Sequence, residues 1–279
     1  MMRKAISTYL FRQAVLGVHL LDQVARAGFE WIEIYCDRQH FDYTNPGHVR
    51  EIAEWFAGSP VKLHSLHAPL SHDPEGTSHH SVVSIAFMEK QRRQDSMDEI
   101  KRALEVAESI PFRYLVAHLG VPGEEFDPRK FDAALTSLEH LHLFASQRGV
   151  EILLENIPNE LSTPSRLLEF FQHTHLHNLR VCFDCGHAQL DGNVQEELTK
   201  LGSSVAAVHL HDNGGTTDEH RFPFEGILSW KEFIPKLART TPEAAWLLEV
   251  RDAERAHYDL EKAAGVFARF DQILEEEKR

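Results

Sequence analysis

The chain has 279 residues, a length that suits one large domain over residues 1–279 with a substantial buried core. Its 43 acidic and 29 basic residues give a net charge of −14, which repels the phosphate backbone of nucleic acids and argues against DNA or RNA as the usual partner. Three cysteines are too few for a secreted disulfide framework, and the first residues hold neither a signal-peptide core nor a long apolar run, so we expect a cytoplasmic protein without a membrane span.

Short apolar segments alternate with longer amphipathic segments along the chain. The apolar segments are rich in Val, Ile, Leu and aromatic residues and are too short for helices, so each predicts a strand. In chain order the expected strands are 4–8, 31–36, 61–68, 114–120, 150–157, 179–187, 206–213 and 245–250.

The segments between the expected strands have the periodicity of helices. Over 98–110, apolar residues recur every three to four positions. Pro164 directly after Thr163 indicates the start of another helix, and Ser229 followed by Glu232 predicts a capping box at the start of a later one.

Eight strand–helix repeats follow one another without a linker, a low-complexity tract or a charge block. This order predicts an α/β fold, a single (β/α)8 TIM barrel. An open doubly wound sheet is the alternative, but no glycine-rich dinucleotide turn follows the first expected strand.

Residues of the types that bind metals end six successive expected strands. In a barrel of this kind the active site lies at the carboxyl ends of the strands. A single His there is usually a hydrogen-bonded core residue, but several carboxylates without Lys or Arg among them are costly to bury unless a cation compensates. The joint placement therefore predicts a divalent metal site. The residues, from the third to the eighth strand, are His67, His118, Glu155, Asp184 with His187, His209 with His211, and Glu249.

The segment 208–226, which follows the seventh expected strand, adds further candidate ligands. Asp218 and His220 are two residues apart, so both side chains can face one ion in an extended segment. Near the second strand, Glu33 and Tyr35 are candidates for the pocket wall, and the loop after them is a candidate lid.

The motifs LLEN, FDCGHA, VHLHDN, DEH, FEG and LLEV together resemble the xylose isomerase-like barrel superfamily. This group includes sugar isomerases and epimerases and the AP endonuclease family 2 fold of endonuclease IV. In the isomerases and epimerases, a Glu, an Asp, a His and a Glu on strands five to eight hold one divalent ion. Carried over to this chain, the resemblance implies Glu155, Asp184, His209 and Glu249 as ligands.

In the endonuclease IV branch, further ligands hold two more ions. The matching positions here are His67 and His118 for one ion, and His187, Asp218 and His220 for the other. The resemblance thus implies one to three divalent ions per chain, zinc or manganese in the first place and magnesium or cobalt as alternatives.

The resemblance implies a sugar or sugar phosphate isomerase or epimerase that transfers a proton through an enediolate. Glu155 and Glu249, on opposite sides of the ion, would then be the general acid and base. The substrate would be a small sugar, and self-assembly into a homo-oligomer stays open. Candidate substrate contacts are His187, His211, Glu33 and Arg221.

Other functions stay open as alternatives. The complete nine-residue ligand set favours an endonuclease IV-like trinuclear zinc phosphodiesterase acting on abasic DNA. The charge of −14 weighs against it, as do AHLGVPG and HLHD, because endonuclease IV has His-Pro-Gly at the first of these positions and an intervening Asn at the second. A keto-inositol dehydratase and a non-catalytic barrel that binds metal and sugar are further alternatives.

Overall fold

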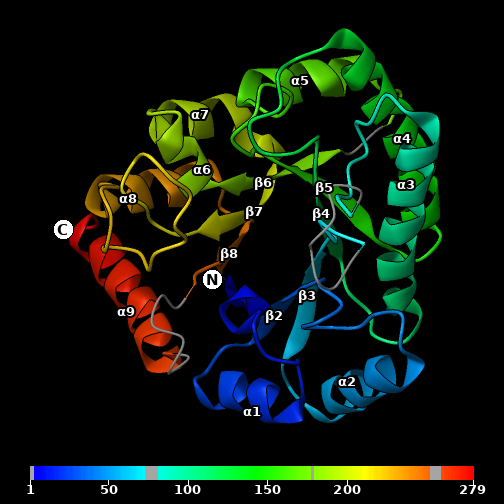
Figure 1. Ribbon diagram of the computed structural model, residues 1–279. Coiled ribbons are helices and arrows are strands. Elements are labelled where there is room, and N and C mark those ends of the chain that lie inside the picture. The colour runs from blue at the N-terminus through cyan, green and yellow to red at the C-terminus, as the bar shows by residue number, and fades with distance from the viewer. Residues whose placement is uncertain (1–2, 73–80, 177–178, 252–258) are drawn as a thin grey trace.

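Eight parallel strands close into a barrel in which each strand pairs with the next along the chain and β8 pairs with β1. The computed structural model describes residues 3–72, 81–176, 179–251 and 259–279. Seen along the barrel axis, helices form a ring around the strands (Figure 1). The predicted (β/α)8 TIM barrel is confirmed. The strands are β1 (Arg3–Ser7), β2 (Trp31–Tyr35), β3 (Lys62–His67), β4 (Tyr114–His118), β5 (Glu151–Glu155), β6 (Arg180–Asp184), β7 (Val205–Leu210) and β8 (Ala245–Leu248).

The α-helices of the ring follow the strands in chain order. They are α1 (Val18–Arg26), α2 (Pro46–Gly58), α3 (Lys90–Glu105), α4 (Pro128–Ser146), α5 (Pro164–His173), α6 (Cys185–Leu190), α7 (Val194–Leu201), α8 (Trp230–Thr240) and α9 (Leu260–Glu276). In the described parts of the chain, three short 3-10 helices accompany them, namely η1 (Thr8–Phe11), η2 (Val106–Glu108) and η3 (Gly202–Ser204). Within the described ranges, no helix combines the length and the apolar character that crossing a membrane requires.

The predicted helix starts have different outcomes. The Thr163 side chain accepts a hydrogen bond from the backbone N–H of Arg166, and α5 begins at Pro164, as predicted. Ser229 precedes α8, but its side chain makes no capping hydrogen bond, so the predicted capping box is wrong. The ψ angle of Ser229 is 79°, short of the extended backbone that directs an N-cap hydroxyl toward the first turn.

The expected strand 179–187 divides into a strand and a helix. Strand β6 ends at Asp184, whose carboxylate accepts a hydrogen bond from the backbone N–H of His187 at 2.7 Å and so caps α6. As a result, His187 lies in the first turn of a helix that starts at the carboxyl end of β6.

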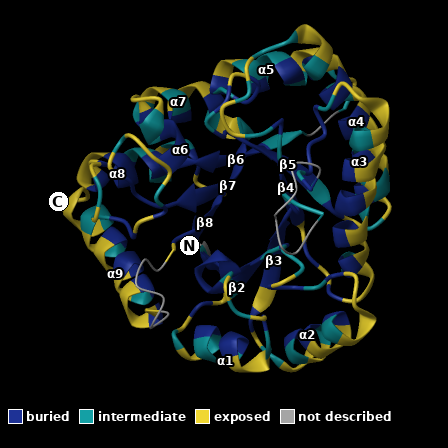
Figure 2. Cartoon of the chain, in the orientation of Figure 1, coloured by how far each residue is buried: buried dark blue, intermediate teal, exposed yellow. Residues whose placement is uncertain are grey.

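The barrel interior is filled by side chains and is not a pore. Val116, Leu153, Cys182 and Ala207 belong to its interior cluster, and each lies two residues before a candidate site residue on the same strand. Because side chains two apart share a strand face, the site residues form the next layer above this cluster. A larger apolar core lies between strands and helices, whose outer faces are exposed (Figure 2).

Candidate metal centre

Four buried side chains meet at the carboxyl ends of β5 to β8. They are Glu155, Asp184, His209 and Glu249, here called the main group, and one ligand atom of each lies within 4.8 Å of the others. The parallel register pairs Asp184 with His209 on neighbouring strands, which places both at the same height in the barrel. Three acids and one imidazole without Lys or Arg in the group form a donor set that fits a divalent cation.

The two ring nitrogens of His209 face different partners. Its Nδ1 lies 3.0 Å from Glu155 Oε1 and 3.3 Å from Glu249 Oε2, whereas its Nε2 lies 3.3 Å from Glu33. Glu33 is fully buried and accepts a hydrogen bond of 2.8 Å from the Ser65 hydroxyl. Glu33, a candidate substrate contact from the sequence, thus lies beneath His209, in a position from which a carboxylate would orient the imidazole of a metal-binding histidine.

Electrostatics in the main group oppose the effect of burial. Burial raises the pKa of Glu155, but the charge of His209 and hydrogen bonds from His118, His209 and His67 hold that pKa well below its ordinary value. Burial likewise raises the pKa of Glu249, and the charge of His209 outweighs it and brings the pKa to about 2. Both carboxyl groups are therefore ionised at neutral pH.

A second group shares Glu155 with the main group. It contains His67, His118 and Glu155, with ligand atoms again within 4.8 Å of one another. His118 Nε2 lies 2.9 Å from Glu155 Oε2, and His67 Nε2 lies 3.3 Å from the same oxygen. Because Oε1 of Glu155 faces His209 and Oε2 faces the two histidines, this carboxylate links the two groups.

A third group contains His187, His211, Asp218 and His220. His187 Nδ1 and His220 Nδ1 donate to backbone carbonyls, while the Nε2 atoms lie 3.2 and 3.0 Å from Asp218 Oδ2. A backbone bond on one ring nitrogen, with the other directed at a shared centre, is the usual orientation of metal-binding histidines.

His211, a candidate substrate contact from the sequence, is placed by the structure in the third group. Its Nε2 donates to Asp184 at 3.0 Å, and its ring stacks on that of His220 at 4.0 Å between centroids. Its Nδ1 is buried without a hydrogen-bond partner in the described chain and lies 3.9 Å from Asp218 Oδ1. A buried imidazole nitrogen of this kind also fits a cation. The available signal was the period of two between His209 and His211, which puts both on one strand face.

The loop that carries Asp218 and His220 is organised around Asp212. This buried carboxylate accepts hydrogen bonds from the backbone N–H groups of Phe224 and Leu228 and from Trp230 Nε1. A Cβ atom at Gly226 would overlap Asp212, so the glycine permits the close approach. The loop is therefore held in place by its own polar core.

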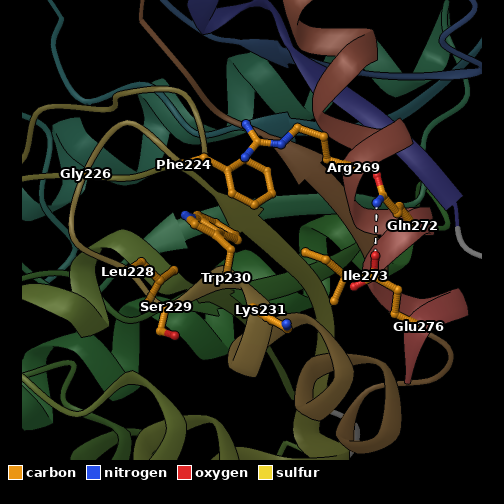
Figure 3. Close-up of a pocket in the computed structure, with 10 residues that line it drawn as sticks. All are labelled: Phe224, Gly226, Leu228, Ser229, Trp230, Lys231, Arg269, Gln272, Ile273 and Glu276. Atoms are coloured by element: carbon orange, nitrogen blue, oxygen red, sulfur yellow. Dashed lines mark hydrogen bonds between the residues drawn. The ribbon is translucent and has the colours of Figure 1, made fainter. Parts of the chain in front are cut away.

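Aromatic packing supports the same loop from outside the barrel. Phe224, Trp230 and Arg269 line a hollow of about 480 Å³. Figure 3 shows Phe224 between Arg269 and Trp230. The Arg269 guanidinium carbon is 3.4 Å from the Phe224 ring centre, and the Phe224 and Trp230 ring centres are 5.7 Å apart. This packing joins the loop to α9.

A cavity of about 170 Å³ opens above the main group, and Glu155 and Glu249 line it. Tyr9 and Tyr35 form an aromatic wall: the ring centres are 5.0 Å apart, and Tyr9 packs on His220 at 4.7 Å. Tyr35 is the wall residue expected from the sequence, whereas Tyr9 was missed because it lies beyond the short strand β1.

Two further regions lie away from this cavity. Arg221, another candidate substrate contact, has an exposed side chain that donates to Glu219 and to the Glu225 carbonyl. In the expected lid, Arg38 and Tyr43 bind the buried carboxylate of Glu99 on α3 at 2.9 and 2.5 Å. These contacts anchor the loop after β2 to a helix.

The comparisons with known proteins agree with this architecture. An uncharacterized protein of Methanocaldococcus jannaschii, MJ1311, is 28% identical over 271 residues, which cover 92% of this chain and 87% of that protein. Among solved structures, a D-tagatose 3-epimerase-like protein has a TM-score of 0.81, with 24% identity and full coverage of both chains. The IOLI protein, solved with a zinc atom, has a TM-score of 0.79, with 17% identity and 99% coverage of both chains.

A family model described as xylose isomerase-like TIM barrel matches residues 21–270, a span that runs from α1 into α9 and takes in β2 to β8. The match therefore contains every residue of the three candidate ligand groups. With the closed barrel of eight parallel strands, it shows that this chain belongs to the xylose isomerase-like TIM barrel family.

Proposed function

We propose that the protein is a divalent-metal-dependent isomerase or epimerase of a small sugar, which moves a proton between carbons next to a carbonyl through an enediolate. The observation that carries this proposal is that two of the four residues of the main group line the cavity and the other two do not. All four members are buried together, but Glu155 and Glu249 also line the cavity, whereas Asp184 and His209 do not. Two carboxylates thus face a substrate, and the other two residues serve only as ligands.

Glu155 and Glu249 suit the roles of general base and general acid. They come from the ends of β5 and β8, strands that do not pair with each other, and in this proposal they approach the reacting carbons from two sides. Both are ionised at neutral pH, so either can take a proton from the carbon next to the carbonyl and, once protonated, return it to the neighbouring carbon. For epimerisation, the carboxyl on the opposite face must first take up a proton from solvent before it can donate one. A cation held by the main group would polarise the substrate carbonyl and stabilise the negative charge that develops on its oxygen.

The remaining candidates take supporting roles in this proposal. Glu33 orients His209, and His187 positions a substrate hydroxyl from the wall of the cavity. We place the protein in the reducing cytoplasm, because Cys36, Cys182 and Cys185 are buried and unpaired.

A trinuclear phosphodiesterase is the second candidate function. The observation that favours it is the presence of three ligand groups around one cavity, with Glu155 shared by two of them. Against it, the net charge is −14, and Arg12 is the one Lys or Arg among the described residues that line the cavity. A DNA backbone would need a broader basic surface.

Metal content and proton exchange test the proposal. Glu155→Gln and Asp184→Asn should each lower the metal content of the purified protein, and Glu155→Gln should lower solvent-proton exchange on ketoses about 100-fold or more. Glu139→Gln, an exposed acid on α4, is the matched control. Unchanged metal content in both site variants would refute the main group as a metal site.

The double variant His67→Ala/His118→Ala separates the two candidate functions. For an isomerase it should keep the ion of the main group and part of the proton exchange. For a phosphodiesterase it should remove one ion and nearly all activity, because clustered ions act as a unit. Efficient metal-dependent incision of abasic DNA by the wild type, with no proton exchange on any ketose, would favour the phosphodiesterase.

A further inference from the structure

Arg12 is the one Lys or Arg among the described residues that line the cavity above the main group. It follows η1 and lines the cavity together with Glu155, Asp218 and Glu249. Its Nη1 donates to the Tyr9 hydroxyl at 3.0 Å, and its guanidinium carbon lies 4.7 Å from the Tyr9 ring centre. In the described parts of the chain, no carboxylate forms an ion pair with Arg12. Because a guanidinium has five N–H donors, most of its binding capacity remains available.

Tyr9 sets the position of this guanidinium relative to the ligand groups. The ring of Tyr9 packs on His220, a member of the third group, and its hydroxyl accepts the hydrogen bond from Arg12. Tyr9 therefore separates a free cation from the candidate metal centre by the width of one aromatic side chain.

We infer that Arg12 binds an oxyanion carried by the substrate, so that the sugar bears a phosphate ester or a carboxylate at the end remote from the reacting carbons. This inference rests on the proposed function. A neutral sugar has no group that requires a guanidinium, whereas a phosphate ester or a carboxylate requires N–H donors, and Arg12 is the one Lys or Arg among the described residues that line the cavity. The planar fork of a guanidinium matches both phosphate and carboxylate oxygens.

Binding to the metal-loaded protein tests the inference without requiring turnover. Calorimetry compares D-ribulose 5-phosphate with D-ribulose, and D-ribonate with ribitol, so that the phosphate and the carboxylate have separate arms. The wild type should bind at least one anionic probe about tenfold or more tightly than its neutral counterpart, as expected for a charge-assisted hydrogen bond. Added NaCl should reduce this preference, because the mouth is open to solvent.

Variants identify the residue responsible. Arg12→Gln should remove most of the preference, and Arg12→Lys should retain part of it, since a point charge remains without the fork. Arg50→Gln, which removes an exposed charge on α2, is the matched control and should bind like the wild type. Metal content and melting temperature of each variant show that the fold and the metal centre are intact.

The outcomes separate this inference from the proposed function. No anionic preference in the wild type, or the same preference in Arg12→Gln, would overturn the inference, and the second result would mean that the ions hold the anion. An Arg12-dependent preference without proton exchange on any ketose would sustain the anion site and refute the isomerase. Full turnover of a neutral ketose with no anionic preference would sustain the isomerase and refute the anion site.

Discussion

His40 is a fully buried histidine outside the three ligand groups. Its Nδ1 donates to the Ala14 carbonyl at 2.7 Å, and its own carbonyl accepts a hydrogen bond from Leu16, so it joins the loops after β1 and β2. Burial lowers the pKa of His40 to about 4, and the Ala14 bond opposes that shift only in part. The residue is therefore neutral in the folded protein at pH values where the unfolded chain is already protonated.

This difference predicts a specific loss of stability in acid. Since the folded pKa is below the unfolded value of 6.5, the unfolded chain takes up a proton first as the pH falls. The free energy of unfolding should fall from pH 6.5 toward pH 4, by about 2 kcal/mol at pH 5. In chelator-treated protein, urea unfolding at pH 7 and 5 should show a smaller difference for His40→Gln than for the wild type or for His140→Gln, an exposed control. Equal differences in all three proteins would contradict the assignment.

At the scale of elements, the packing of α6 on the end of β7 depends on a glycine. Gly186 lies in α6, and a Cβ atom there would overlap the ring of His211, which follows β7. His211 cannot move aside freely, because it donates to Asp184 and stacks on His220. Because Gly186 has no side chain, α6 can pack directly against His211 of the third group at the end of β7.

Gly186→Ala should therefore displace His211. We expect a loss of about 1–3 kcal/mol in the free energy of unfolding, as for other overpacked sites, together with weaker metal binding by the third group. Gly265→Ala is the matched control: Gly265 is an exposed residue of α9 with open space around it, so alanine should stabilise the helix by up to about 1 kcal/mol. Unfolding curves and zinc titrations measure both effects. If the two variants behaved alike, the role of Gly186 would be refuted.

At the scale of the whole molecule, the main group joins the ends of four strands. Glu155, Asp184, His209 and Glu249 come from β5, β6, β7 and the residue after β8, and the unfolded chain does not hold them together. An ion bound there stabilises the closed barrel by mass action, because it binds the folded state in preference to the unfolded one.

Removal of the ion should lower the melting temperature. At a metal concentration 100 times the dissociation constant the ion contributes about 2.7 kcal/mol, which corresponds to a decrease of about 5 °C for a chain of this size. Calorimetric scans with and without a chelator measure this decrease. Asp184→Asn should respond less to the chelator than the wild type does. Identical wild-type scans would exclude a tight site.

The sequence by itself determined the barrel and the convergence of the main group. Alternating strand and helix patterns leave few topologies, and in a closed parallel barrel all carboxyl ends meet at one mouth. A ligand-type residue that ends a strand, such as Glu155 or His209, is therefore placed by local pattern and chain order alone. The likeness of the motifs to one superfamily supplied the grouping of these residues.

Tertiary structure alone decided which side chains face the cavity and which lie beneath it. Glu33 and Tyr35 share one face of β2, yet Glu33 lies under His209 and Tyr35 lines the cavity, because their height in the barrel depends on the stagger of strands distant in sequence. Arg12 reaches the mouth only because β1 closes on β8, a pairing between the two ends of the chain. Local periodicity predicts which face of a strand a side chain takes. It does not predict how deep in the barrel the side chain lies, or which residue it meets where β1 pairs with β8.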